Sequence, residues 1–154
     1  MREAELRMYF FTIYQLTGIQ KGIQCGHAAL EYVEMYGERA QYKEFIKKHK
    51  TWIVLNGGVT QNNLMPEEGS INFISTLLHQ QGIEYASFRE PDLNNAMTAV
   101  CFLVDERVFN KIEFPDYGDW LIDNPNNMYH NWVDFIGGNE NATLREIIDG
   151  KRLA

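Results

Sequence analysis

The stretch QKGIQCGHAALEYV, residues 20–33, holds a lysine, a cysteine and a histidine within seven positions, and its structure decides the fold. Three interpretations are open: a catalytic cluster, a metal site, or the start of a packed helix. Apolar and small residues recur in it at the i, i+3, i+4, i+7 spacing of one helical face: Gly26, Ala29, Leu30 and Val33. This spacing predicts a helix over residues 22–37, with Gly37 as its C-cap, that packs closely on a neighbouring element.

Strand-type runs surround this helix. They are rich in aromatic, β-branched and apolar residues and occupy residues 8–16, 51–55, 83–89 and 97–104. Further helices are predicted at 39–49 and at 71–81, where Ser70 is the N-cap. The resulting order, β-α-α-β-α-β-β, predicts an α/β fold with helices packed on a mixed sheet. The last two strands are separated by only about seven residues, so we expect them to pair as a hairpin.

The character of the sequence changes after Val104. Residues 1–104 carry 9 Lys and Arg against 11 Asp and Glu, whereas residues 105–154 carry 5 against 10, so most of the net charge of −7 lies in the second segment. That segment is also aromatic, with Trp120, Tyr129, Trp132 and Phe135. Because burial of aromatic area favours docking, we expect an acidic extension, residues 105–154, packed on a core of residues 1–104. Short helices are predicted in it near 128–136 and 143–149.

Composition narrows the class of protein. The chain has 154 residues, 45% of them hydrophobic, which is typical of a globular domain. We expect no contact with a membrane, because no apolar run approaches the roughly 20 residues that span a bilayer, and no signal-peptide pattern is present. The two cysteines are too few for a disulfide framework and favour a cytoplasmic location. The four histidines lack metal-ligand spacing, so we expect neither a metal nor another cofactor.

Lys21 is the most reactive candidate in the opening stretch. It lies just before the predicted helix, where free backbone N–H groups together with a lysine can bind an anion. The alternative interpretation is that the Lys21 side chain simply extends into solvent. Cys25 and His27 are two positions apart on a helix and do not face each other, so they do not form a nucleophile pair. We expect Cys25 to be a small buried hydrophobe, whereas His27 either lines a site or is a hydrogen-bonded core residue.

Two further polar segments offer binding groups. FREPDLNNAMT, residues 88–98, follows a predicted strand end, where ligand contacts gather in α/β folds, although its Asp and Asn residues also suit a turn. Pro91 favours an extended backbone at Glu90. The segment Arg39–Lys50 holds five basic residues and one glutamate, and it is either a phosphate-binding patch or a solvated helix face.

These motifs resemble the type 2 peptidyl-tRNA hydrolases of archaea and eukaryotes. The resemblance rests on QKGIQCGHAA (20–29), TWIVL (51–55), QQGIEYASFRE (80–90) and the strand that Thr98 opens, and it covers about residues 8–104. It implies a four-stranded mixed sheet with helices on both faces, in a protein that is often a homodimer. The implied activity is metal-independent hydrolysis of the ester that joins a peptide to tRNA.

Carried over residue by residue, the resemblance assigns the family's lysine to Lys21, its acid to Glu90 and its threonine to Thr98. Lys21 would hold a phosphate or polarise the ester carbonyl, and Glu90 would orient or activate water. Thr98 would offer its hydroxyl to the substrate or to that water. The family's acid is an aspartate, so Asp92 competes with Glu90 for the role. Further substrate contacts are expected from His27, Asp92, Asn95, Arg39, Lys43 and Lys47.

A second class of function stays open: a non-catalytic binding or oligomerising protein on the same fold, with no activity on tRNA. The segment from Glu90 to Thr98 is shorter than in the family and lacks glycine, and the C-terminal extension is additional. Both features favour this alternative. Salt-sensitive binding of tRNA separates the two classes, because contacts to phosphates release counterions.

Overall fold

The computed structural model describes residues 3–154, which divide into two compact units. The larger unit comprises Arg7–Leu103 together with Lys151–Ala154. The second unit comprises Val104–Gly150 together with residues 3–6. All of the predicted site residues lie in the larger unit.

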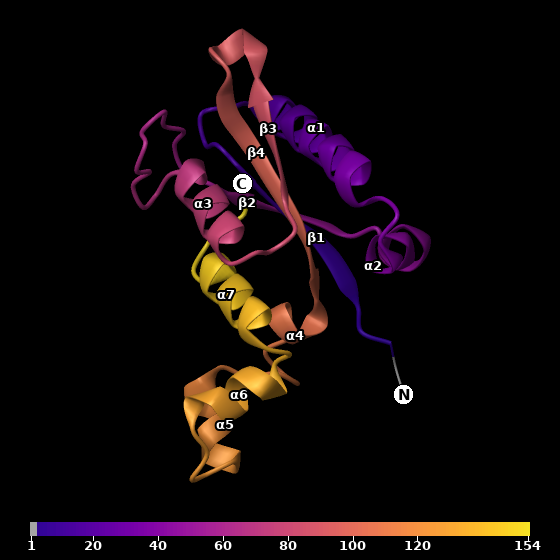
Figure 1. Cartoon of the computed structure of the whole chain (residues 1–154), viewed down its shortest axis with the longest axis vertical. Coiled ribbons are helices and arrows are strands. Elements are labelled where there is room, and N and C mark those ends of the chain that lie inside the picture. Colours follow the sequence, from indigo (N-terminus) through magenta and orange to yellow (C-terminus); the bar gives the residue numbers. More distant parts are fainter. Residues whose placement is uncertain (1–2) are drawn as a thin grey trace. The chain divides into compact units, whose positions relative to one another are not determined.

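A four-stranded sheet forms the centre of the larger unit (Figure 1). Its strands are β1 (Leu6–Thr12), β2 (Trp52–Asn56), β3 (Ala86–Glu90) and β4 (Ala96–Asp105). They lie in the order β2-β1-β4-β3, with β1 and β2 parallel and β3 and β4 antiparallel. The sheet is therefore mixed, and the predicted hairpin is confirmed. β4 is buried along nearly its whole length, as its continuous apolar run requires.

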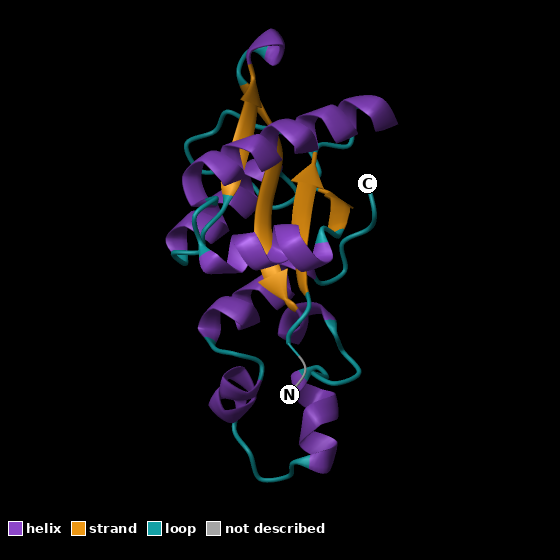
Figure 2. Cartoon of the chain, turned by 90° about the vertical axis from the view of Figure 1, so that its right-hand side faces the viewer, coloured by secondary structure: helices purple, strands orange, loops and turns teal. Residues whose placement is uncertain are grey.

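Helices cover both faces of this sheet. α1 (Gly18–Tyr36) lies on one face and α3 (Ile71–Gln80) on the other (Figures 1 and 2). Successive side chains of a strand point to opposite faces, so Glu90 and Thr98 reach α1 while Arg89 and Met97 lie with residues of α3. The helix predicted for 39–49 is split into α2 (Ala40–Glu44) and one π-helical turn, Phe45–His49.

The face by which α1 packs on the sheet is not the predicted one. Its buried residues are Gln24, Cys25, Ala28 and Tyr32. Leu30 is 69% exposed and Val33 41% exposed, although their spacing predicted the packing face. The small side chains of Cys25 and Ala28 let the helix approach β4, and the Cys101 thiol donates to the Ala28 carbonyl at 3.4 Å. A polar residue, Gln24, can join this buried face because its amide finds partners there.

Two features surround β2: a pairing along its outer edge and a glycine turn after its last residue. Residues 152–154 pair with its outer edge, through Asn56 N–H to the Arg152 carbonyl (2.8 Å) and Ala154 N–H to the Val54 carbonyl (3.0 Å), which shields that edge from other strands. Gly58 follows the strand with φ 83, and a Cβ there would collide with the Gly69 carbonyl oxygen. The loop then leads to α3, which the Ser70 hydroxyl caps as predicted, accepting from Phe73 N–H at 3.1 Å.

The second unit has its own core. Its helices are α4 (Glu106–Phe109), α5 (Tyr117–Asp123), α6 (Tyr129–Phe135) and α7 (Asn139–Ile148). α6 and α7 correspond to the two helices predicted near 128–136 and 143–149, whereas the short α4 and α5 were not predicted. Two tryptophans and two aliphatic residues form its buried centre: Trp120, Trp132, Val133 and Ile136. The aromatic residues of the extension thus pack on one another within this unit.

Arg145 organises the second unit. Its side chain is 6% exposed and donates to the carbonyl oxygens of Arg107 (2.8 Å) and Phe114 (2.9 Å) and to the carboxylate of Asp116 (2.8 Å). The guanidinium also lies 5.4 Å from the centre of the Trp132 ring. A buried charge with this many partners is fixed in place, and losing the Asp116 carboxylate would leave it without its compensating charge.

Candidate functional site

The start of α1 differs from the prediction and changes the setting of Lys21. The helix begins at Gly18, four residues earlier than expected, because Thr17 and Gln20 form a reciprocal capping box at its N-terminus. Lys21 therefore lies inside the first turn, where its backbone N–H donates to the Thr17 carbonyl at 2.9 Å. Its side chain is half-buried, and its ammonium group makes no hydrogen bond or ion pair with residues 3–154.

Gln24, one turn after Lys21, is the centre of the site. Its amide nitrogen donates to Glu90 Oε2 at 2.8 Å, and its amide oxygen accepts from Thr98 Oγ1 at 2.6 Å. The side chain is buried and joins α1 to both strands of the hairpin. The prediction missed Gln24 as a functional residue. The available signal was its position, three residues after Lys21 and three before His27, which places it on the same side of the helix.

Glu90 is held as a carboxylate at the end of β3. Besides the Gln24 amide, its other oxygen accepts the Asp92 backbone N–H at 3.3 Å, as the cap of the 3-10 turn Pro91–Leu93. The Gln24 hydrogen bond is the main cause that lowers the pKa of Glu90, followed by the Asp92 N–H; partial desolvation opposes them, and the charge of His27 adds a small lowering effect. A glutamate is ionised at neutral pH in any case, and the lowered pKa makes Glu90 a weaker base, which suits it to orient water more than to remove a proton.

Thr98 lies beneath Gln24 with no exposed surface. Its hydroxyl is directed to the Gln24 amide oxygen and to the Phe88 carbonyl, 3.5 Å away. The Thr98 carbonyl in turn accepts from the Thr12 hydroxyl at 3.0 Å. The hydroxyl that was expected to meet the substrate is thus used inside the protein, where it fixes the rotamer of Gln24.

The other candidates near Glu90 are more exposed. The His27 ring stacks on Phe88 with 4.5 Å between ring centres, and it makes no hydrogen bond with residues 3–154. Asp92 is exposed, and its carboxylate likewise has no partner among the residues described. Asn95 has φ 62 in the tight turn, where its backbone N–H donates to the Glu90 carbonyl at 3.0 Å. Of the two competing acids, Glu90 is the one that the structure holds against α1.

The basic segment lies at the other end of α1. The helix runs to Tyr36, so about 22 Å of helix at 1.5 Å per residue separates Lys21 from its C-terminus, and Arg39 lies beyond that end. Arg39 pairs with Glu84 at 2.9 Å and Lys43 with Glu38 at 3.0 Å, both on the surface. Lys47 has no partner within residues 3–154. The structure therefore groups Gln24, Glu90 and Thr98 near Lys21 and His27, but leaves the three basic residues at a distance.

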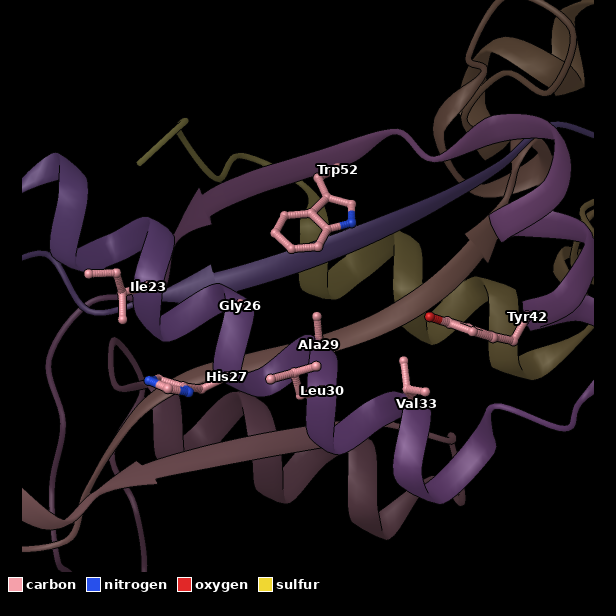
Figure 3. Close-up of a pocket in the computed structure, with 8 residues that line it drawn as sticks. All are labelled: Ile23, Gly26, His27, Ala29, Leu30, Val33, Tyr42 and Trp52. Carbon is pink, nitrogen blue, oxygen red and sulfur yellow. The ribbon is translucent and has the colours of Figure 1, made fainter.

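An apolar groove of about 520 Å³ lies beside α1 (Figure 3). Figure 3 shows Trp52 of β2 above the helix and Tyr42 of α2 at one end. The remaining lining residues come from α1: Ile23, Gly26, His27, Ala29, Leu30 and Val33. The groove contains the stripe that was predicted to be buried, so it is the direct result of the altered packing face.

The thiol of Cys25 is buried in the packed face of α1. Burial raises the pKa of the Cys25 thiol to about 12, so it stays protonated at neutral pH and behaves as the expected small hydrophobe. Among residues 3–154, no three His, Cys, Asp or Glu side chains are grouped to hold a metal ion. In the same range, none of the helices combines the length and the apolar character needed to cross a bilayer.

The sequence matches no protein-family model, and no curated protein shows significant similarity to it. Function is therefore inferred from the geometry of the Gln24–Glu90–Thr98 bridge and from the residues around it.

Replacing Gln24 by leucine should raise the pKa of Glu90 towards the ordinary glutamate value, because the amide donor is the first cause of the lowered pKa. An NMR titration of the Glu90 carboxyl carbon measures this, with Gln41→Leu on exposed α2 as a control that should leave the pKa unchanged. In the wild-type protein, the ionised carboxylate stabilises the fold above its unfolded-state pKa, and this contribution is lost as pH falls through the folded-state pKa. Equal Glu90 pKa values in Gln24→Leu and wild type would show that the amide does not hold the carboxylate.

Proposed function

We propose that the protein is a hydrolase that cleaves the ester bond of peptidyl-tRNA or of a related aminoacyl ester. The observation that carries the proposal is the carboxylate of Glu90, held by the Gln24 amide at a strand end next to the helical turn that holds Lys21. The Lys21 ammonium has no partner within residues 3–154, so it is free to bind an anion. An oriented carboxylate can position the attacking water, and an unpaired cation can stabilise the charge that develops on the ester, so the two groups together suit ester hydrolysis.

In the proposed reaction, Glu90 holds a water molecule by accepting one of its hydrogens. The water oxygen attacks the ester carbonyl, and Lys21 stabilises the negative charge that develops on the carbonyl oxygen or on a neighbouring phosphate. The bond from the carbonyl carbon to the ribose oxygen then breaks; one proton of the attacking water passes to the ribose oxygen, and the other is released to solvent. The products are a peptide carboxylate and a tRNA with a free hydroxyl. Thr98 acts through Gln24 and is a positioning residue.

The distant basic segment fits a long substrate. A nucleic acid carries a phosphate at every nucleotide, so a chain whose ester lies at Glu90 can also reach a cation beyond the C-terminal end of α1, about 22 Å of helix from Lys21. The exposed pairs of Arg39 and Lys43 do not prevent this, because surface ion pairs contribute only about 0–1 kcal/mol and can exchange partners. Homodimer formation and tRNA as the partner remain part of this proposal.

Release of peptide from an N-blocked aminoacyl-tRNA should fall at least about 100-fold in both Lys21→Ala and Glu90→Gln, because each removes a group that acts on the reacting atoms. Matched controls are Lys151→Ala and Glu34→Gln, which make the same changes at exposed positions outside the site. Asp92→Asn should lose less activity than Glu90→Gln. A larger loss in Asp92→Asn would transfer the role of the acid to Asp92, and wild-type turnover in Lys21→Ala and Glu90→Gln would refute the site.

Binding of tRNA should weaken as salt rises, and Lys47→Gln should lower the slope of log K against log salt by roughly 0.7–0.9 if one phosphate contact is lost. Lys47 is the informative choice because it has no competing partner among residues 3–154. Fluorescence anisotropy with labelled tRNA over a salt series gives the slope, and Lys151→Gln should leave it unchanged. A binding constant that does not respond to salt would argue against phosphate contacts.

A second candidate function is that of a non-catalytic, oligomerising protein, and the exposed stripe of α1 favours it. The stripe follows the alternating spacing of four and three residues that is typical of a helix–helix seam: Ile19, Ile23, Gly26, Leu30 and Val33. Its large members are 41–80% exposed. Ile19 and Val33 each lie seven residues from Gly26, so a second copy related by a two-fold axis would place Ile19 against Val33.

Under this second candidate, wild-type protein should sediment as a dimer and Leu30→Glu as a monomer, because a charge in an apolar seam is costly to bury. Analytical ultracentrifugation checks this over a range of concentrations. Glu34→Gln, on the same helix but outside the seam, should leave the mass unchanged. A wild-type protein that is monomeric at all concentrations would eliminate the seam as an interface.

A further inference from the structure

A second pocket, of about 340 Å³, lies on the α3 face of the larger unit. It is bounded by the loop after β2, by α3 and by the ends of β3 and β4. Arg89 contributes to it from β3, whereas Glu90, the next residue, reaches α1 on the opposite face. The pocket is therefore separate from the Gln24–Glu90–Thr98 bridge, and its ligand chemistry does not depend on the proposed hydrolase activity.

Two polar side chains in this pocket are more than nine-tenths buried yet keep hydrogen-bonding capacity unused. Asn72 is 6% exposed; its oxygen accepts the Gln61 backbone N–H at 2.7 Å, but its amide nitrogen donates to nothing within residues 3–154. Ser75 is 8% exposed, and its hydroxyl also has no partner in that range. Neither group is among the fully enclosed polar atoms without a partner, so both reach the open space of the pocket, one helical turn apart, and are available to a ligand.

The charge of the pocket points to an anionic ligand. Arg89 donates to the Asn95 carbonyl at 3.2 Å through one nitrogen, which leaves the rest of its guanidinium available. No carboxylate is present among the lining residues. The loop adds the amides of Asn62 and Asn63, while Leu64, Pro66 and Met97 supply apolar surface.

We propose that this pocket binds a nucleoside 5′-phosphate. The Arg89 guanidinium matches a phosphate, which it can bind through parallel N–H donors. The Asn72 amide and the Ser75 hydroxyl match the edge of a base, for which asparagine is a suitable partner, and the apolar side chains cover its flat face. The volume lies at the lower end of the range for small-molecule sites, so it suits one nucleotide.

The test is calorimetric titration of the full chain with AMP, GMP, CMP and UMP, with adenosine and inorganic phosphate as separate arms. At least one mononucleotide should bind more tightly than either part alone. Arg89→Gln and Asn72→Asp should each weaken that binding about tenfold or more, because each loses a charge-assisted or buried hydrogen bond. Asn72→Asp keeps the oxygen that accepts from Gln61 and suits the first turn of α3, so it should fold.

Ser75→Ala provides a second buried variant, with a smaller expected loss, and Lys151→Gln is a control of equal charge change outside the pocket. A 5′-phosphorylated tetranucleotide shows the source of the ligand: tighter binding than the mononucleotide indicates the end of an RNA strand, and equal binding indicates a free nucleotide. The proposal is overturned if no mononucleotide binds, if phosphate binds as tightly as the nucleotides, or if binding survives both Arg89→Gln and Asn72→Asp.

Discussion

The amide of Gln24 joins α1 to two neighbouring strands through a hydrogen bond at each end, 2.6 Å to Thr98 and 2.8 Å to Glu90. A polar side chain on the packed face of a helix destabilises the fold by about 1–3 kcal/mol if its partners are absent. With both partners present, the amide fixes the rotation of α1 about its own axis. The same amide lowers the pKa of Glu90 and holds its carboxylate against the helix, so the packing of the fold and the electrostatics of the site have one origin.

This constraint also explains the unusual surface of α1. Since the helix meets the sheet through Gln24, Cys25 and Ala28, its most apolar stripe faces outward. The stripe and Trp52 of β2 then line a groove of about 520 Å³. A contiguous exposed apolar surface of this kind marks an interaction site more often than an isolated exposed residue does. The proposed hydrolase site and the seam that favours self-association therefore lie on the same helix and result from the same choice of packing face.

The sequence predicted the kind and order of the main elements because each carries a strong local signal. The apolar run of β4, the Ser70 cap of α3 and the short connection of the hairpin depend on neighbouring residues alone. The packing face of α1 could not be predicted in this way, because burying Gln24 is favourable only when Thr98 and Glu90, far away in sequence, complete its hydrogen bonds. The predicted helix start was wrong because Thr17 suits the end of a strand as well as a helix cap.

In the site, too, the sequence predicted individual residues but not the contacts between residues that are far apart in the chain. A resemblance pointed to Lys21, Glu90 and Thr98, and the structure brings Glu90 and Thr98 to one side chain that the resemblance did not single out. The sequence could not decide whether Glu90 or Asp92 is the acid of the site, because the direction of each carboxylate depends on the turn that begins at Pro91. The ion pair of Arg39 could not be predicted from the charge run, because Glu84 comes from a different part of the chain.

A double-mutant cycle between Gln24→Leu and Thr98→Val, read from free energies of unfolding in urea, tests the bridge most directly. If the amide joins the helix to the strand, Thr98→Val should destabilise the wild-type protein by about 1–3 kcal/mol, because it leaves the Gln24 oxygen without a donor. In the Gln24→Leu background the same change should cost much less, so the two effects are coupled. Effects that add to within about 0.5 kcal/mol would show that the two side chains act independently and would contradict the bridge.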